Sequence, residues 1–183
     1  TSAVSGLAAT SRFYARWARL YDAIATRTPG VGSLRARLAD RAGLAPGDTV
    51  IDLGCGTGAN FRSLRERVGP SGRVIGVDAT PAMLDRARDR ASAWENVSVC
   101  RGDAADPPIP PTGRADAVVA SFLVGLLDTP ADTVAGWLDL LGRDGRVALL
   151  DAAPSDRALV GPLNALFGKR VSSWDAICRW FFT

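Results

Sequence analysis

The sequence predicts an α/β protein, a three-layer α/β/α sandwich with a mainly parallel, doubly wound sheet. Two observations predict it. From about residue 46 on, short β-branched runs alternate with helical stretches, as in chains built from βαβ units. These runs also lack the period-two alternation of a sheet with one face in water, which indicates helices on both faces. With 183 residues, 47% of them hydrophobic, the chain is long enough for one globular domain with a large core.

Each element of this sandwich follows from a local pattern. Pro81 suits the first turn of a helix, and Gly142 is expected to end a later helix. The apolar residues on one face of that later helix are Val134, Trp137, Leu138 and Leu141. The proline-rich segment 103–113 predicts an irregular loop. The expected strands are residues 49–53, 73–78, 97–101, 115–121 and 146–151, and the expected helices are residues 60–68, residues 81 onward and residues 131–141.

Two further helices are expected before the sheet, at residues 11–25 and 34–42, because apolar side chains recur there at helical spacing. We therefore expect three regions: N-terminal cap helices (residues 1–45), a ligand-binding core (residues 46–153) and an apolar and basic C-terminal segment (residues 154–183). The chain stops on Trp180, Phe181 and Phe182. An aromatic end of this kind is compatible with a truncated chain.

Composition excludes several classes of function. The net charge of +3 comes almost wholly from arginines interleaved with acids, because Lys169 is the only lysine, so no nucleic-acid partner is expected. The sequence has neither a secretory signal nor an apolar run long enough to cross a bilayer, which predicts a cytoplasmic protein without a transmembrane segment. It has no histidine, and its three cysteines lack metal-ligand spacing, so no metal site is expected.

Three glycines at alternate positions follow the first expected strand, in the segment Asp52-Leu53-Gly54-Cys55-Gly56-Thr57-Gly58. Glycine lets a ligand lie directly against the main chain. A helix is expected directly after this turn, and the N–H groups of its first turn suit the carboxylate of an amino acid or a phosphate. The alternative is a tight turn without a ligand, although a turn alone needs only one glycine.

The next three expected strands also end in residues that can contact a ligand. Asp78, followed by Ala79, suits ribose hydroxyls, although it can instead cap the helix that begins at Pro81. Met83 can lie against a flat adenine ring or belong to the core. The third and fourth strands end at Gly102-Asp103-Ala104, which suits an adenine, and at Ser121. Because parallel strands end at one edge, these residues converge on one site there.

These motifs resemble the class I, Rossmann-like S-adenosylmethionine-dependent methyltransferases over about residues 49–151. The resemblance implies that S-adenosylmethionine is the cofactor and S-adenosylhomocysteine the product. It implies that the D-x-G-x-G-x-G turn, with Asp52, Gly54, Gly56 and Gly58, holds the methionine half, with Cys55 between the glycines. Asp78 would then hold the ribose, and the step Gly102, Asp103 and Ala104 would lie at the adenine.

Phe13-Tyr14 and Tyr21-Asp22 are similar to the start of the ubiquinone and menaquinone C-methyltransferases and of some phospholipid N-methyltransferases. This similarity implies that Tyr14 and Tyr21 close over the cofactor, although aromatic packing of an accessory helix explains them equally well. The apolar cap helix, the apolar run from Ser121 to Leu127 and the basic–aromatic stretch from Leu163 to Trp180 indicate a small, lipophilic methyl acceptor (a quinone, lipid or amine) and are compatible with a transient contact with a membrane surface. The family fold ends in an antiparallel hairpin, and no pattern for it follows Asp151, so this hairpin is expected to be missing.

Two alternatives stay open. The segment Gly54 to Ala59 also satisfies the G-x-G-x-x-A pattern of NAD(P)-dependent oxidoreductases, but Asp52 stands where those enzymes have an apolar residue, and no tyrosine has a lysine four positions later. The second alternative is a non-catalytic S-adenosylmethionine-binding protein. We assign no catalytic residue, because positioning can carry most of a methyl transfer and nothing in the sequence singles out a base. The sequence does not predict an oligomeric state.

Overall fold

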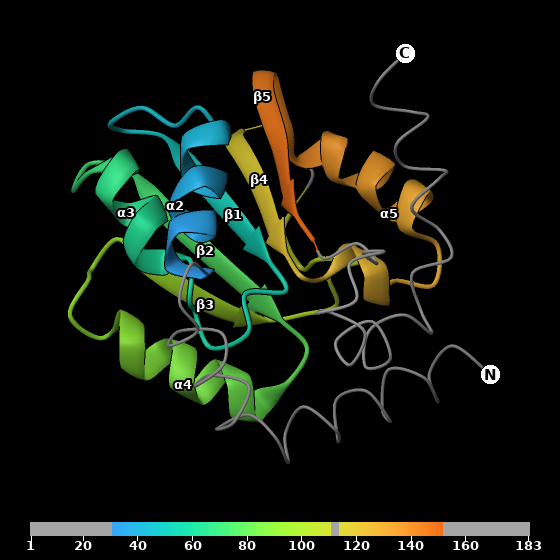
Figure 1. The fold of residues 1–183 in the computed structure, drawn as a ribbon, viewed down its shortest axis with the longest axis horizontal. Coiled ribbons are helices and arrows are strands. Elements are labelled where there is room, and N and C mark those ends of the chain that lie inside the picture. The colour runs from blue at the N-terminus through green and yellow to red at the C-terminus, as the bar shows by residue number, and fades with distance from the viewer. Residues whose placement is uncertain (1–30, 111–113, 152–183) are drawn as a thin grey trace, which may run out of the picture.

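The sheet of the computed structural model has five strands in the order β3-β2-β1-β4-β5 (Figure 1). The structure describes residues 31–110 and 114–151. Every neighbouring pair of strands in this sheet is parallel, as the sequence predicts. Four strands coincide with the predicted ranges and the fifth begins earlier; the strands are β1 (Thr49–Leu53), β2 (Arg73–Asp78), β3 (Val97–Arg101), β4 (Ala115–Ser121) and β5 (Leu141–Leu150).

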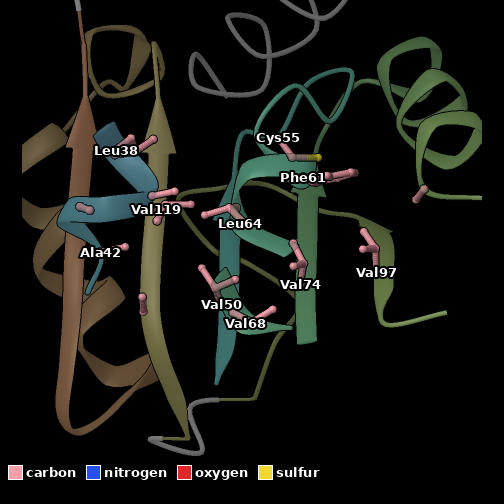
Figure 2. Close-up of a cluster of buried hydrophobic side chains, with 14 of the residues drawn as sticks. Leu38, Ala42, Val50, Cys55, Phe61, Leu64, Val68, Val74, Val97 and Val119 are labelled. Atoms are coloured by element: carbon pink, nitrogen blue, oxygen red, sulfur yellow. The ribbon is translucent and has the colours of Figure 1, made fainter. Parts of the chain in front are cut away.

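Helices cover both faces of this sheet, which confirms the three-layer architecture. The described α-helices are α2 (Val31–Arg41), α3 (Phe61–Val68), α4 (Pro81–Ala91) and α5 (Pro130–Trp137), with short 3-10 helices η1 (Val124–Leu126) and η2 (Leu138–Leu140). Side chains of α2, α3 and α4 pack against one face in a first core cluster, part of which Figure 2 shows. Residues of α5, η1 and η2 pack against the other face in a second cluster.

Consecutive residues of the central strands belong to different clusters, as a sheet buried on both faces requires. Val118 of β4 lies in the second cluster and Val119 in the first, and both are fully buried. On α3, Phe61, Leu64 and Val68 recur at helical spacing and are also fully buried. Burial of each large apolar side chain contributes about 1.5–3 kcal/mol. The well-packed core therefore holds in place the edge of the sheet where the strands end.

The sequence prediction was wrong at the end of α5. The helix was expected to continue to Leu141 and stop at Gly142, but it ends at Trp137, a 3-10 turn follows, and β5 begins at Leu141 instead of residue 146. Leu141 pairs with Ala115, ahead of an irregularity in the β4–β5 register. Because a 3-10 turn has about three residues per turn, Leu138 leaves the buried face and is 45% exposed, while Leu140 is buried.

The other elements predicted from the sequence are the proline-rich loop, the two helices before the sheet and the segment after Asp151. Residues 103–110, the described part of the proline-rich segment, contain no helix, as expected. Helix α2 begins at Val31, three residues before the predicted start, and it packs against α3 and β5. The expected helix at residues 11–25 and the segment after Asp151, where the final hairpin would fall, lie outside the described residues. Among the described helices, no span is long and apolar enough to cross a membrane.

Candidate functional site

The glycine turn after β1 is fixed to the neighbouring strand β2 by its own main chain. Gly54, Gly56 and Gly58 have positive φ angles of 64°, 55° and 76°. The N–H of Cys55 donates to the carbonyl of Val77 in β2 at 3.0 Å, and the N–H of Gly58 donates to the carbonyl of Cys55 at 2.9 Å. These two bonds satisfy amides inside the turn and hold it at the carboxyl edge of the sheet.

The three glycines have different surroundings. A Cβ at Gly54 would come within 2.8 Å of Leu123, and a Cβ at Gly58 would come within 2.5 Å of the Phe61 ring, so both are needed for close packing. A Cβ at Gly56 would meet no atom within 4 Å. Gly56 therefore faces open space, where a ligand can approach the main chain.

The Phe61 ring and the Cys55 thiol both lie against Gly76 of β2. Figure 2 shows the two side chains close together. Burial raises the pKa of the Cys55 thiol well above its usual range, and the charges of Asp52 and Asp78 raise it further. The thiol is therefore protonated at neutral pH, and this state makes it a poor nucleophile. Cys55 belongs to the packed floor of the turn.

Asp78 joins the end of β2 to the glycine turn and to the start of α4. One carboxylate oxygen accepts the N–H of Gly56 at 2.9 Å, and the other accepts the N–H of Thr80, the residue before α4, at 2.8 Å. Asp78 does not cap α4, because its bond goes to the N–H of Thr80, the N-cap residue, and not to an N–H of the first helical turn. Its contact with a ribose stays a prediction. Burial raises the pKa of Asp78, and the bonds from Thr80 and Gly56 partly offset this rise.

A buried polar cluster lies where β1, β4, α2 and α3 meet; its members are Arg35, Asp52, Asn60 and Ser121. Asn60 donates through Nδ2 to Asp52 Oδ1 and to Ser121 Oγ, both at 3.0 Å. Arg35 donates to Asn60 Oδ1 at 2.6 Å and to Ser121 Oγ at 3.0 Å. Asn60 stands at the N-cap position of α3, yet its side chain makes no cap bond. Neither Asn60 nor Arg35 was predicted from the sequence. Asn60 has the pattern of a helix N-cap residue, and Arg35 has the pattern of an exposed arginine on a helix.

Asp52 is the one acid of this cluster, and its surroundings shift its pKa strongly. It is fully buried, and burial raises its pKa from 3.8 to about 7, while the Asn60 bond and the Arg35 charge lower it and the Asp78 charge raises it. Its Oδ2 has no hydrogen-bond partner among the described residues. Buried polar atoms are nearly always paired in folded proteins, so Oδ2 fits a ligand that supplies a donor or a positive charge.

The loop after β3 carries the predicted adenine contacts and is attached to α5. Asp103 accepts the N–H of Ala105 through Oδ1 at 2.9 Å. The Ala104 carbonyl accepts the ring N–H of Trp137, a buried residue of α5, at 2.7 Å. Nothing in the sequence indicates this bond, since a tryptophan on an apolar helix face is expected to contribute only packing.

The segment after β4 begins with backbone strain. Phe122 has φ 56°, the one positive φ among the described non-glycine residues, and its N–H donates to the Leu150 carbonyl at 2.7 Å. The Arg35 guanidinium lies 5.5 Å from the centre of the Phe122 ring. Strained residues persist where surrounding contacts hold them and are frequent at functional sites. The half-buried Leu123, Leu126 and Leu127 follow, and Leu123 and Leu127 pack against the second core cluster.

The other predicted site residues have these positions. Ala79, which lies between Asp78 and Thr80 in the chain, is half-buried. Met83 of α4 is 2% exposed and is therefore as buried as the side chains of the hydrophobic core. Tyr14 and Tyr21 lie outside the described residues. Contacts of the predicted residues with a cofactor stay predictions. Among the residues that the structure describes, no group of acids and cysteines could hold a metal ion.

Comparison with known proteins connects this site to a family. A family model described as a methyltransferase domain matches residues 50–145. The chain is 39% identical to a nocamycin O-methyltransferase from Saccharothrix syringae over 147 residues, which is 76% of this chain and 49% of that protein. It is 36% identical to a 2-phytyl-1,4-naphtoquinone methyltransferase from Thermosynechococcus vestitus over 108 residues, which is 59% of this chain and 48% of that protein. The chain thus spans about half the length of these curated relatives.

Comparison with solved structures points to the same family. A crystal structure of geranyl diphosphate C-methyltransferase from Streptomyces coelicolor A3(2), in complex with Mg²⁺, geranyl diphosphate and S-adenosyl-L-homocysteine, superposes with a TM-score of 0.62. The two chains are 26% identical, and the match covers 75% of this chain and 54% of the other. The parallel sheet, the glycine turn and these matches together show that the chain belongs to the methyltransferase-domain family and has the class I, Rossmann-like fold of S-adenosylmethionine-dependent methyltransferases.

Proposed function

We propose that the protein binds S-adenosylmethionine at the carboxyl edge of its sheet and transfers the methyl group to a small, lipophilic acceptor. The observation that carries the proposal is the surroundings of Gly56. Its Cα faces open space, its N–H is held by Asp78, and the buried Asp52 nearby has a carboxylate oxygen without a partner among the described residues. An amino acid linked to a ribose has the matching groups, an ammonium and two vicinal hydroxyls.

The residues proposed to hold the cofactor fall into three groups along this edge. The methionine half would lie against the turn, and Asp78 would accept hydrogen bonds from the ribose hydroxyls. Ala79, Met83, Asp103 and Ala104 would lie around the adenine. Ser121, Tyr14 and Tyr21 complete the proposed set, and the turn contributes Asp52, Gly54, Cys55, Gly56 and Gly58.

When bound, this cofactor supplies a methyl group on a positively charged sulfur, which a nucleophile displaces in line. The chain binds and orients the cofactor and the acceptor and excludes water from them. These effects account for most of the rate when the reacting atoms are well aligned. The described residues include no histidine, and the Cys55 thiol is buried and protonated. We therefore assign no general base to the described part of the site.

The lipophilic acceptor is supported by the surface next to the turn. Leu123, Leu126 and Leu127, which follow β4, are half-buried and so keep part of their apolar area exposed, and apolar side chains around a site favour apolar ligands. The names of two similar proteins include substrates with a prenyl-type chain, a phytyl naphthoquinone and geranyl diphosphate. These names support a quinone or prenyl-type acceptor for this chain over a small polar amine.

Calorimetric titration of the 183-residue chain with S-adenosylhomocysteine and, separately, with NAD tests the cofactor. We expect a dissociation constant in the micromolar range, about −8 kcal/mol of binding free energy, for S-adenosylhomocysteine and no heat of binding for NAD. Binding of NAD alone would refute the proposal and favour an oxidoreductase.

Methyl-labelled cofactor tests the acceptor. The chain is incubated with a prenylated naphthoquinol, a phospholipid vesicle or a water-soluble amine such as ethanolamine, and the label is followed into organic and aqueous extracts. We expect the label in the quinol. Transfer to ethanolamine without transfer to the quinol or the lipid would overturn the lipophilic acceptor while leaving methyl transfer intact. Cofactor binding without transfer to any acceptor would favour a non-catalytic binding protein.

A further inference from the structure

Arg35 is a buried cation that contacts three separate segments of the site. It belongs to α2, far in the chain from the glycine turn, and only 7% of its surface is exposed. Its guanidinium donates to Asn60 before α3 and to Ser121 at the end of β4, and it lies 5.5 Å from the centre of the Phe122 ring. Burial of a cation is costly unless acceptors and negative charge surround it, so its position indicates a specific role.

That role concerns the carboxylate of Asp52. Asn60 receives a bond from Arg35 through Oδ1 and donates through Nδ2 to Asp52 Oδ1. The orientation of the Asn60 amide is therefore fixed by Arg35, because the oxygen must face the guanidinium and the nitrogen must face the carboxylate. Ser121 Oγ accepts from both Arg35 and Asn60, which closes the cluster.

We propose that Arg35 is a positioning residue of the cofactor site, which acts through Asn60 and Ser121 to hold the Asp52 carboxylate in place for the ammonium group of the cofactor. The inference rests on the proposed function, because it assumes that S-adenosylhomocysteine binds beside Asp52. It adds a residue of α2 that the glycine motif does not contain.

The charges around Asp52 make this role measurable. Within residues 31–110 and 114–151, the ionised or ionisable groups that face it are Arg35 from α2, Asp78 from β2 and Cys55 from the turn. Among them, Arg35 is the group that lowers the pKa of Asp52. An ammonium ligand prefers the ionised carboxylate, so affinity rises as pH increases through the pKa of Asp52. Removal of Arg35 moves this rise to higher pH.

The test is the dissociation constant of S-adenosylhomocysteine between pH about 5.5 and about 8.5, measured by calorimetry for wild type and Arg35→Met. Methionine keeps much of the length and apolar contact of arginine but has neither charge nor donors. We expect Arg35→Met to bind at least about fivefold more weakly at neutral pH, with the midpoint of its pH profile at least about half a unit higher than in wild type.

Arg67→Met is the matched control. Arg67 also connects α2 to α3, through Asp40 and the Ala36 carbonyl, but it bonds to none of the four residues of the polar cluster. It should lower the melting temperature without moving the pH midpoint. If Arg35→Met instead keeps the wild-type midpoint and loses affinity only as much as Arg67→Met does, Arg35 merely supports the fold and the inference is wrong.

Arg35→Lys covers the case in which Arg35→Met does not fold. Lysine keeps the charge but cannot hold Asn60 and Ser121 with a planar fork, so we expect a midpoint near that of wild type and an affinity reduced about threefold or more. Wild-type affinity in Arg35→Lys would overturn the inference. Failure of wild type to bind S-adenosylhomocysteine would refute the proposed function itself, an outcome distinct from either variant result.

Discussion

The carboxylate of Asp78 accepts the backbone N–H of Gly56 at 2.9 Å, which connects the end of β2 to the middle of the glycine turn. Its other oxygen holds the N–H of Thr80 before α4. One side chain thus sets the distance between the part of the site proposed for the amino acid and the part proposed for the ribose.

Asp78→Asn should weaken both the fold and the affinity for S-adenosylhomocysteine. An amide replaces one acceptor oxygen with an NH₂ group, so either Gly56 or Thr80 loses the acceptor of its N–H, at about 1–3 kcal/mol. We expect the affinity to fall about tenfold or more, since ~1.4 kcal/mol corresponds to a factor of ten. Urea denaturation and calorimetric titration measure the two effects.

Asp85→Asn is the control for this substitution. Asp85 lies on the exposed face of α4 and pairs with Arg88, and an exposed pair of this kind contributes about 0–1 kcal/mol. Unchanged affinity in Asp78→Asn would exclude Asp78 from the binding site.

Gly56→Ala and Gly58→Ala should separate binding from folding. At Gly58 a Cβ would come within 2.5 Å of the buried Phe61 ring, whereas at Gly56 it would meet no atom within 4 Å. Both positions have a positive φ, which costs an alanine about 1–2 kcal/mol. We expect Gly58→Ala to lower the melting temperature more than Gly56→Ala, and Gly56→Ala to abolish binding of S-adenosylhomocysteine while the protein stays folded.

Gly136→Ala provides the reference for these two variants. Gly136 is exposed near the end of α5, and a Cβ there would also meet no atom within 4 Å. In a helix this exchange stabilises by about 0.5–1 kcal/mol, so affinity should be unaffected. Normal binding by Gly56→Ala would show that the open space at Gly56 does not hold the cofactor.

The central fold was predictable because local signals and the tertiary structure agree there. Pro81 begins α4 at the predicted position, and the apolar runs that become β1 to β4 are bounded by turn residues. At Leu138 the local sequence pattern and the tertiary structure conflict. Its helical spacing predicts burial, but pairing of Leu141 with Ala115 ends the helix early and leaves Leu138 exposed. Strand pairing is a long-range contact, which periodicity does not encode.

The candidate site was predictable only in part for a similar reason. The glycine turn and Asp78 are recognisable because the main chain requires particular residues at fixed spacing. Arg35 and Trp137 act on the site from distant elements, α2 and α5, and nothing near either residue in the sequence marks its partner. Such contacts depend on how the helices pack on the sheet, so they become visible only in the folded chain.

Asp52 should make the stability of the protein depend on pH. Its pKa is raised from 3.8 to about 7 in the folded protein, so the unfolded chain ionises it at lower pH than the folded chain does. The free energy of unfolding therefore decreases as pH rises from about 4 to about 7 and then levels off. A rise of about three units corresponds to a loss on the order of 4 kcal/mol.

Comparison with Asp52→Asn isolates this effect from the other acids. The variant cannot ionise at this position, so its stability relative to wild type should increase between pH about 4 and about 7 and stay constant above. Urea denaturation at several pH values, without ligand, measures the difference. A difference that does not change with pH would mean that Asp52 ionises as readily in the folded chain as in the unfolded one.

Trp137→Phe should weaken adenine binding by releasing the loop after β3. Phenylalanine keeps an aromatic ring in the second core cluster but cannot donate to the Ala104 carbonyl, which accepts the indole N–H at 2.7 Å. We expect a loss of about 1–3 kcal/mol in unfolding free energy from the unpaired carbonyl. Because the loop also carries Asp103, the affinity for S-adenosylhomocysteine should fall about three- to tenfold, or up to ~1.4 kcal/mol.

Trp94→Phe is the appropriate control, since Trp94 packs against the first core cluster just before β3 begins, at the opposite edge of the sheet from the site. Its replacement removes the same indole atoms and should lower the melting temperature but leave the affinity unchanged. Equal losses of affinity in the two variants would mean that general loosening of the core, and not the bond to Ala104, controls the loop. A selective loss in Trp137→Phe would instead make α5 the element that holds the adenine side of the site in position.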